Sequence, residues 1–169
     1  MEGVVKQVLS VLLLLFVQDD VYQQGKAQLE AKNYDAAEAS FRQLLEMEPP
    51  TASKGYEGMA LVDIGRKNYD KAVEDAKKSV ELNGDSAEAH YSLGLAYGYK
   101  QDFKNAAPSL EKALELNPNN AYAHYQLGSA QYRLKRYDQT IIHWEKFLQM
   151  MPNAPEAPQI RSILKTVRG

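Results

Sequence analysis

The chain has 169 residues, of which 44% are hydrophobic and 25% are charged, a composition that suits a globular domain with a continuous core. Its 20 basic and 22 acidic residues leave a net charge of −2, which gives no electrostatic reason to expect nucleic acid as a partner. The absence of cysteine excludes disulfides, thiolate metal sites and thiol catalysis.

The least polar stretch lies near the start of the chain, between Val4 and Val17, where only Lys6, Gln7 and Ser10 are not apolar. It is shorter than the roughly 20 apolar residues that span a bilayer, but residues 8–17 have the length of the hydrophobic part of a secretory signal. No small-x-small cleavage site follows. Three interpretations stay open for residues 1–17: an uncleaved signal-anchor, a signal cleaved at an atypical site, and an apolar helix that packs on the next segment or on another subunit.

The charges that flank this stretch favour the first interpretation. Lys6 lies near its amino-terminal end, and Asp19 and Asp20 follow it, so the positive-inside tendency would place the rest of the chain outside the cytoplasm. We therefore predict a protein that contacts a membrane through this stretch, membrane-associated or extracytoplasmic, with a cytoplasmic location as the alternative.

Two later segments, residues 87–120 and 121–154, are 34-residue versions of one another. Their matching landmarks are Leu93-Gly94 with Leu127-Gly128, His90 with His124, Phe103 with Tyr137, and Pro118 with Pro152. Weaker versions occupy residues 18–51 and 53–86, with Ala52 as one extra residue in a turn between them. A 34-residue period with this order of small and large residues resembles the tetratricopeptide repeat.

The resemblance implies an all-α fold, a right-handed superhelical solenoid of four helix–turn–helix units at 18–51, 53–86, 87–120 and 121–154. Each unit has a small residue in its first helix and another in its second, which would let the two backbones approach closely. These residues are Gly25, Ala60, Gly94 and Gly128 in the first helices and Ala37, Ala72, Ala106 and Thr140 in the second. Proline after the second helix, as at Pro49, is expected to end it.

The segment after the last repeat, residues 155–169, is predicted to be a capping helix. Ile160, Ile163, Leu164 and Val167 fall at helical spacing, and Pro158 suits a first helical turn. The apolar face would cover the last repeat, which has no successor.

The sequence holds no pattern of catalytic or metal-binding residues. His90 and His124 occupy the same repeat position, but further ligands are lacking nearby, so both are predicted to be packing residues. There is no glycine-rich phosphate loop, no Ser/His/Asp order and no isolated carboxylate pair. We predict no enzyme activity, cofactor, metal or small-molecule substrate.

The resemblance implies that the first helices line a concave groove that binds proteins or peptides. Carried over by register, the predicted contact residues are Tyr22, Lys26, Glu57, Leu61, Tyr91, Leu95, Tyr99, Tyr122, Tyr125, Tyr132 and Arg133. Six of the 11 tyrosines fall in this set. Tyrosine offers rigid area and a hydroxyl, which favours recognition, although aromatics at helical spacing also occur in cores.

One known use of the family, a clamp of lysines, asparagines and an arginine that holds acidic chaperone C-termini, does not fit. The corresponding first-unit positions hold Tyr22 and Lys26, Gly58 replaces an asparagine, and the third-unit positions hold Tyr91 and Leu95. We therefore predict a non-catalytic interaction scaffold with a peptide or protein partner of another kind. The alternative is a structural or assembly subunit of a larger membrane complex.

Overall fold

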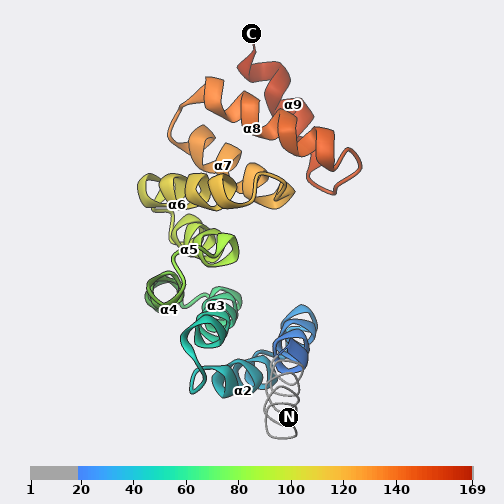
Figure 1. Ribbon diagram of the computed structural model, residues 1–169. Helices are drawn as coiled ribbons and strands as arrows, with labels where there is room; N and C mark the ends of the chain where they lie inside the picture. The colour runs from blue at the N-terminus through green and yellow to red at the C-terminus, as the bar shows by residue number, and fades with distance from the viewer. Residues whose placement is uncertain (1–18, 169) are drawn as a thin grey trace, which may run out of the picture. The chain divides into compact units, whose positions relative to one another are not determined.

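The computed structural model describes residues 19–168, and all of its regular elements there are helices (Figure 1). The all-α prediction is confirmed for this part of the chain. The predicted N-terminal apolar helix, residues 1–17, lies outside the described residues. Between residues 19 and 168, no helix has both the length and the apolar character needed to cross a membrane.

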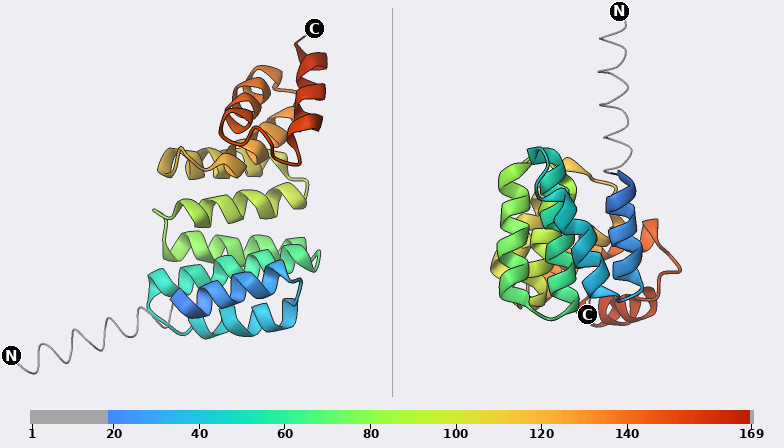
Figure 2. Two further views of the ribbon diagram at one scale, coloured as in Figure 1. Left: turned by 90° about the vertical axis from the view of Figure 1, so that its right-hand side faces the viewer. Right: turned by 90° about the horizontal axis from the view of Figure 1, so that it is seen from below.

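The chain divides after Gly84 into two compact units. The described part of the first unit holds a helix over residues 19–30, α2 (Tyr34–Leu44), α3 (Pro49–Gly65) and α4 (Tyr69–Leu82). The second unit holds α5 (Ala87–Tyr99), α6 (Phe103–Leu116), α7 (Ala121–Arg133), α8 (Tyr137–Met150) and α9 (Ala157–Val167). In each unit, helices that follow one another in the chain pack side by side (Figures 1 and 2).

The described helices form four pairs along the chain: the helix over residues 19–30 with α2, α3 with α4, α5 with α6, and α7 with α8. The same turn joins the two helices of each pair. Lys32, Lys67, Gln101 and Lys135 adopt left-handed backbone conformations, with φ of 58°, 65°, 65° and 61°. The next amide donates back to a carbonyl of the preceding helix, as in Asn33 N to Gln28 O at 2.8 Å and Arg136 N to Gln131 O at 2.9 Å. This is the Schellman ending of a helix, and it reverses the chain after few residues.

Close packing within the pairs depends on the small residues that the sequence analysis singled out. A Cβ added at Gly25, Gly94 or Gly128 would lie 2.6, 2.5 or 2.4 Å from the side chain of Phe41, Leu110 or Trp144, respectively. The small residues of the second helices are fully buried, as predicted; these are Ala37, Ala72, Ala106 and Thr140.

The prediction that Pro49 ends a second helix was wrong. α2 ends at Leu44, and Pro49 is the first residue of α3. Proline is tolerated there because an amide in the first helical turn has no intrahelical acceptor. As a consequence, Ala52 lies inside α3 and is buried, whereas the sequence analysis placed it in a turn.

Helix α3 carries glycines on the face that receives α2. A Cβ at Gly58 would lie 2.2 Å from Phe41 Cδ1, and a Cβ at Gly65 would lie 2.3 Å from Tyr34 Cε1. Glycine inside a helix costs roughly 0.5–1 kcal/mol relative to alanine. Here it permits an aromatic ring to lie directly on the helix backbone.

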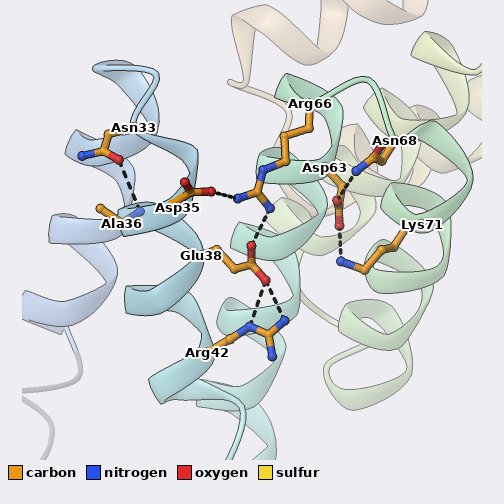
Figure 3. A network of polar contacts seen from close by, with 9 residues as sticks. All are labelled: Asn33, Asp35, Ala36, Glu38, Arg42, Asp63, Arg66, Asn68 and Lys71. Atoms are coloured by element: carbon orange, nitrogen blue, oxygen red, sulfur yellow. Dashed lines mark hydrogen bonds and ion pairs between the residues drawn. The ribbon is translucent and has the colours of Figure 1, made fainter.

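A polar network joins α2, α3 and α4 (Figure 3). Arg66, at the end of α3, donates to Asp35 and Glu38 of α2, and Arg42 donates to Glu38 at 2.6 and 2.9 Å. The hydrogen bond from Arg66 has the largest effect in lowering the pKa of Glu38, and the hydrogen bonds from Arg42 act in the same direction. Exposed ion pairs each contribute only about 0–1 kcal/mol, so the network mainly orients the helices.

One carboxylate of this network is buried. The side chain of Asp63 is 1% exposed, and the Lys71 ammonium lies 2.9 Å from its Oδ2. Asn68 Nδ2 donates to the other oxygen at 3.2 Å. The hydrogen bond to Asp63 raises the pKa of Lys71, and this ion pair joins α3 to α4.

Helix α9 covers the last helix pair. Ile160 and Leu164 are buried in one cluster with Trp144, Phe147 and Ala154. Arg168 forms an ion pair with Glu145 of α8. The predicted capping helix is therefore present, and the large Phe147, where the preceding repeat has Ala113, fills the space beneath it.

His124 and His143 form a half-buried pair between α7 and α8. Their Nδ1 atoms lie 3.0 Å apart, and His124 Nε2 lies 3.2 Å from the Pro118 carbonyl oxygen. Burial, assisted by the neighbouring His124, lowers the pKa of His143 to about 4. Burial also lowers the pKa of His124, and the charge of Lys146 acts in the same direction.

The close approach of the Phe41 ring to Gly58 on α3 gives a test of helix packing. Gly58→Ala should lower the free energy of unfolding by about 1–3 kcal/mol, because the new methyl group overlaps the ring of Phe41. Gly98→Ala is the matched control, since nothing lies within 4 Å of its added Cβ, and it should be neutral or stabilising by up to about 1 kcal/mol. Urea unfolding followed by circular dichroism measures both, and equal effects would contradict this packing.

The histidine pair predicts an acid dependence of stability. Unfolded His143 takes up a proton near its ordinary pKa of 6.5, whereas folded His143 does so only near 4, so stability falls as the pH drops through this window. In His143→Gln this contribution is absent, and the decline between those two pH values should be shallower. The unfolding midpoints of the parent and of His143→Gln, measured across this pH window, test the prediction. Above pH 6.5 the two midpoint curves should run parallel, and curves that are parallel at every pH would refute the assignment.

Candidate functional site

Two adjoining cavities open on the second unit, and together we call them the aromatic groove. The first has a volume of about 410 Å³ and is walled by residues of α5, α6 and α7. The second has a volume of about 300 Å³ and is walled by residues of α7, α8 and α9. Phe103, Tyr125, Ser129 and Glu156 line both cavities.

Helix α7 supplies the tyrosines of the groove. Tyr122, Tyr125 and Tyr132 recur at helical spacing and therefore share one face. The helix begins at Asn120, whose side chain accepts a hydrogen bond from Ala123 N at 3.0 Å and so satisfies one of the free amides of the first turn.

Contacts with α8 hold the tyrosine rings in place. The Tyr125 ring lies 5.3 Å from that of Phe147, and the Tyr132 ring lies 5.6 Å from that of Trp144. Trp144 Nε1 donates to the Tyr125 carbonyl at 3.1 Å, which ties the α8 side chain to the α7 backbone. These rings are therefore supported from behind by the core of the unit.

The rim of the groove is accessible. Tyr99 is 51% exposed and Tyr122 is 40% exposed, and both line the first cavity. Arg133 lines the second cavity with its guanidinium 5.0 Å from the Phe103 ring centroid. Of the predicted contact residues, Tyr99, Tyr122, Tyr125, Tyr132 and Arg133 are thus brought together.

Two predicted residues of the same unit lie elsewhere. Tyr91 packs against the core cluster of α6 and α7, and burial raises its pKa to about 12. Leu95 is half-buried, and neither residue lines the two cavities.

In the first unit, three of the predicted residues, Tyr22, Lys26 and Glu57, lie together. The Tyr22 hydroxyl donates to Glu57 Oε1 at 2.7 Å, and Glu57 is only 8% exposed. The ammonium groups of Lys26 and Lys54 lie 5.6 and 5.7 Å from the centroid of the Tyr22 ring. Leu61 is half-buried on α3.

The sequence analysis missed several groove residues, among them Phe103, Trp144 and Glu156. Phe103 and Trp144 have repeat positions that predict packing, and the structure shows that their rings also face the cavities. Glu156 lies outside the repeats, at the start of α9. Its only sequence signal is an acidic residue between two prolines, Pro155 and Pro158, just before a helix.

Glu156 gives the groove a local negative charge. Its Oε2 atom is buried and has no hydrogen-bond partner within the described chain. Burial raises the pKa of Tyr125, and the charge of Glu156 raises it further, so the carboxylate acts on the groove wall. Among residues 19–168, no group of three or more histidine or acidic side chains is placed to hold a metal ion.

Comparison with known proteins identifies the repeats. Family models described as tetratricopeptide repeat match residues 22–67, 87–120 and 109–141. Among curated proteins, the E3 ubiquitin-protein ligase CHIP of Arabidopsis thaliana is 38% identical over 56 residues, which are 33% of this chain and only 20% of that protein.

Solved structures resemble the whole fold. A crystal structure of MamA is similar with a TM-score of 0.71 and 26% identity, covering 86% of this chain and 84% of that chain. The TPR domain of Arabidopsis OM64 has a TM-score of 0.67 and 22% identity, covering 70% of this chain and 98% of that domain. The helix pairs, the repeat matches and these likenesses show that the chain belongs to the tetratricopeptide-repeat family, whose fold is generally a non-catalytic module for protein–protein interaction.

Proposed function

We propose that the protein is a non-catalytic scaffold that binds a peptide or a protein segment in the aromatic groove. The observation that carries the proposal is the convergence of four tyrosines, Tyr99, Tyr122, Tyr125 and Tyr132, on two adjoining cavities. Buried aromatic anchors supply most of the binding energy at protein interfaces. Rings that are held from behind by Phe147 and Trp144 lose little freedom when a ligand arrives.

The form of the groove favours an extended chain over a compact metabolite. Tyr125 and Phe103 lie between the two cavities and contribute to both, so a ligand could occupy them in sequence. Small-molecule sites bury roughly 70–90% of their ligand. Here Tyr99 and Tyr122 stand at the rim with about half of their surface in solvent, which suits a partner that continues beyond the groove.

The cluster of the first unit is proposed as an additional contact surface. Lys26 and Lys54 beside the Tyr22 ring, together with Leu61, present a mixed charged and apolar patch. Because Tyr22 and Glu57 already bond to each other, we assign this patch a smaller share of the binding energy than the aromatic groove.

A second proposal is that the protein acts at a membrane, to which residues 1–17 attach it, with the repeats outside the cytoplasm. The support is the apolar stretch from Val4 to Val17 and the order of charges around it. A structural or assembly subunit of a larger membrane complex is the alternative that the same stretch supports.

The groove proposal predicts a separation of binding from stability. A peptide selected from a random library by the full-length protein should bind Tyr99→Ala roughly 5- to 150-fold more weakly, which corresponds to about 1–3 kcal/mol. The thermal midpoint should change little, because Tyr99 is half in solvent. Trp144, the one tryptophan of the chain, lines the second cavity, so its fluorescence reports binding directly.

Ile142→Ala is the matched control for this experiment. Ile142 is 55% exposed on α8 and lines neither cavity of the groove, so its truncation should leave the affinity unchanged. Equal losses in both variants, or a library that yields no binder, would contradict the groove as the binding surface.

The membrane proposal predicts how the full-length protein fractionates. It should sediment with membranes and resist carbonate extraction, whereas Leu13→Arg should move most of it to the soluble fraction, because a charge in the middle of an apolar helix costs about 2.5–3.5 kcal/mol on insertion. Leu82→Arg, on the exposed end of α4, is the control and should stay in the membrane pellet. A soluble full-length protein would exclude the anchor.

A further inference from the structure

We propose that the aromatic groove is selective for a cationic side chain, lysine or arginine, of the bound peptide, with Glu156 as its counter-charge. This inference rests on the proposed function and adds the chemistry of the ligand to it. The carrying observation is a buried carboxylate oxygen that has no partner in the described chain and borders two cavities.

The position of Glu156 explains why its charge is uncompensated. The residue stands at the amino end of α9, but its side chain makes no capping hydrogen bond to that helix. Glu156 as a whole is half-buried, but its Oε2 atom is buried without a partner, and a polar atom that has lost water without a replacement is unfavourable. A cation that enters from either cavity would complete the missing pair.

The surrounding rings suit the same ligand. The faces of aromatic rings attract cations, and Tyr125 and Phe103 stand beside Glu156 in both cavities. In the first cavity, Glu156 is the one charged side chain among the described residues that line it. The lining of that cavity therefore carries one negative charge, which disfavours an acidic peptide.

Among the described residues that line the two cavities, Arg133 is the cation that could compete for the carboxylate. It lines the second cavity together with Glu156, but its guanidinium lies over the Phe103 ring, 5.0 Å from the centroid. No ion pair between the two side chains is formed in the described chain. Arg133 thus shows that a guanidinium fits against this aromatic wall, and it leaves Glu156 open to an external cation.

The test uses two small probes that differ in charge. Nα-acetyl-arginine amide should perturb the Trp144 fluorescence and the amide resonances at the start of α9 of the full-length protein at millimolar concentration. Nα-acetyl-citrulline amide, its neutral isostere, should bind at least roughly tenfold more weakly, because the counter-charge no longer contributes.

Variants connect the effect to the carboxylate. Glu156→Gln should reduce the affinity for the arginine probe by at least roughly tenfold while the thermal midpoint stays equal or rises, since an unpaired buried charge is removed. Glu115→Gln, which changes the net charge equally at an exposed position of α6, should bind as the parent does. Arg133→Gln should retain or improve binding.

The outcomes separate the two proposals. Library peptides that bind the groove without enrichment of lysine or arginine, and with equal affinity for Glu156→Gln, would overturn the cation inference and leave the proposed function in place. A protein that binds neither library peptides nor the arginine probe would overturn both. A citrulline probe as strong as the arginine probe would also refute the role of charge.

Discussion

The fold depends on one repeated contact, in which a large side chain of the second helix lies against a residue without a Cβ in the first. Gly25 receives Phe41, Gly94 receives Leu110 and Gly128 receives Trp144. In the second repeat, the corresponding positions hold the alanines Ala60 and Ala76, and both are fully buried. The combined volume of the two facing side chains is therefore limited in each repeat, because the helix backbones must come close enough to exclude water. Trp144 links this constraint to the candidate site, since its ring lies against Gly128 and also lines the second cavity.

The sequence predicted the structure where the same buried side-chain contact recurs in each repeat. It did not predict features in which only a backbone conformation recurs. Small residues 34 positions apart indicate the helix pairs, because each must occupy the same crowded site. The left-handed turns at Lys32, Lys67, Gln101 and Lys135 recur as regularly, but lysine and glutamine carry no signal for that conformation. The prediction that Pro49 ends a helix was wrong for a related reason. Proline is compatible both with the end of one helix and with the first turn of the next.

The candidate site was predictable in part for the same reason. Repeat register placed Tyr122, Tyr125 and Tyr132 on one face of a helix, and in the structure all three line the aromatic groove. It does not determine depth, which depends on the neighbouring helix, so the burial of Tyr91 against α6 and α7 could not be read from its register. The bond between Tyr22 and Glu57 joins residues 35 positions apart, and Glu156 comes from a segment outside the repeats. Contacts of this kind arise only when the helices are packed.

Asp75 and Glu156 each have a buried carboxylate oxygen without a hydrogen-bond partner among the described residues, and they show how the surroundings decide what such a group can do. Asp75 of α4 is 7% exposed, and burial raises its pKa, so its surroundings favour the neutral form that a core can hold. Glu156 borders two cavities instead, and there a ligand can restore the missing interaction. An unsatisfied buried group costs about 1–3 kcal/mol, more if charged, and a hydrogen-bond donor of the ligand recovers that cost, a cationic donor most strongly. We infer that selectivity in this groove arises from the unsatisfied carboxylate, whereas the tyrosines supply affinity for any apolar chain.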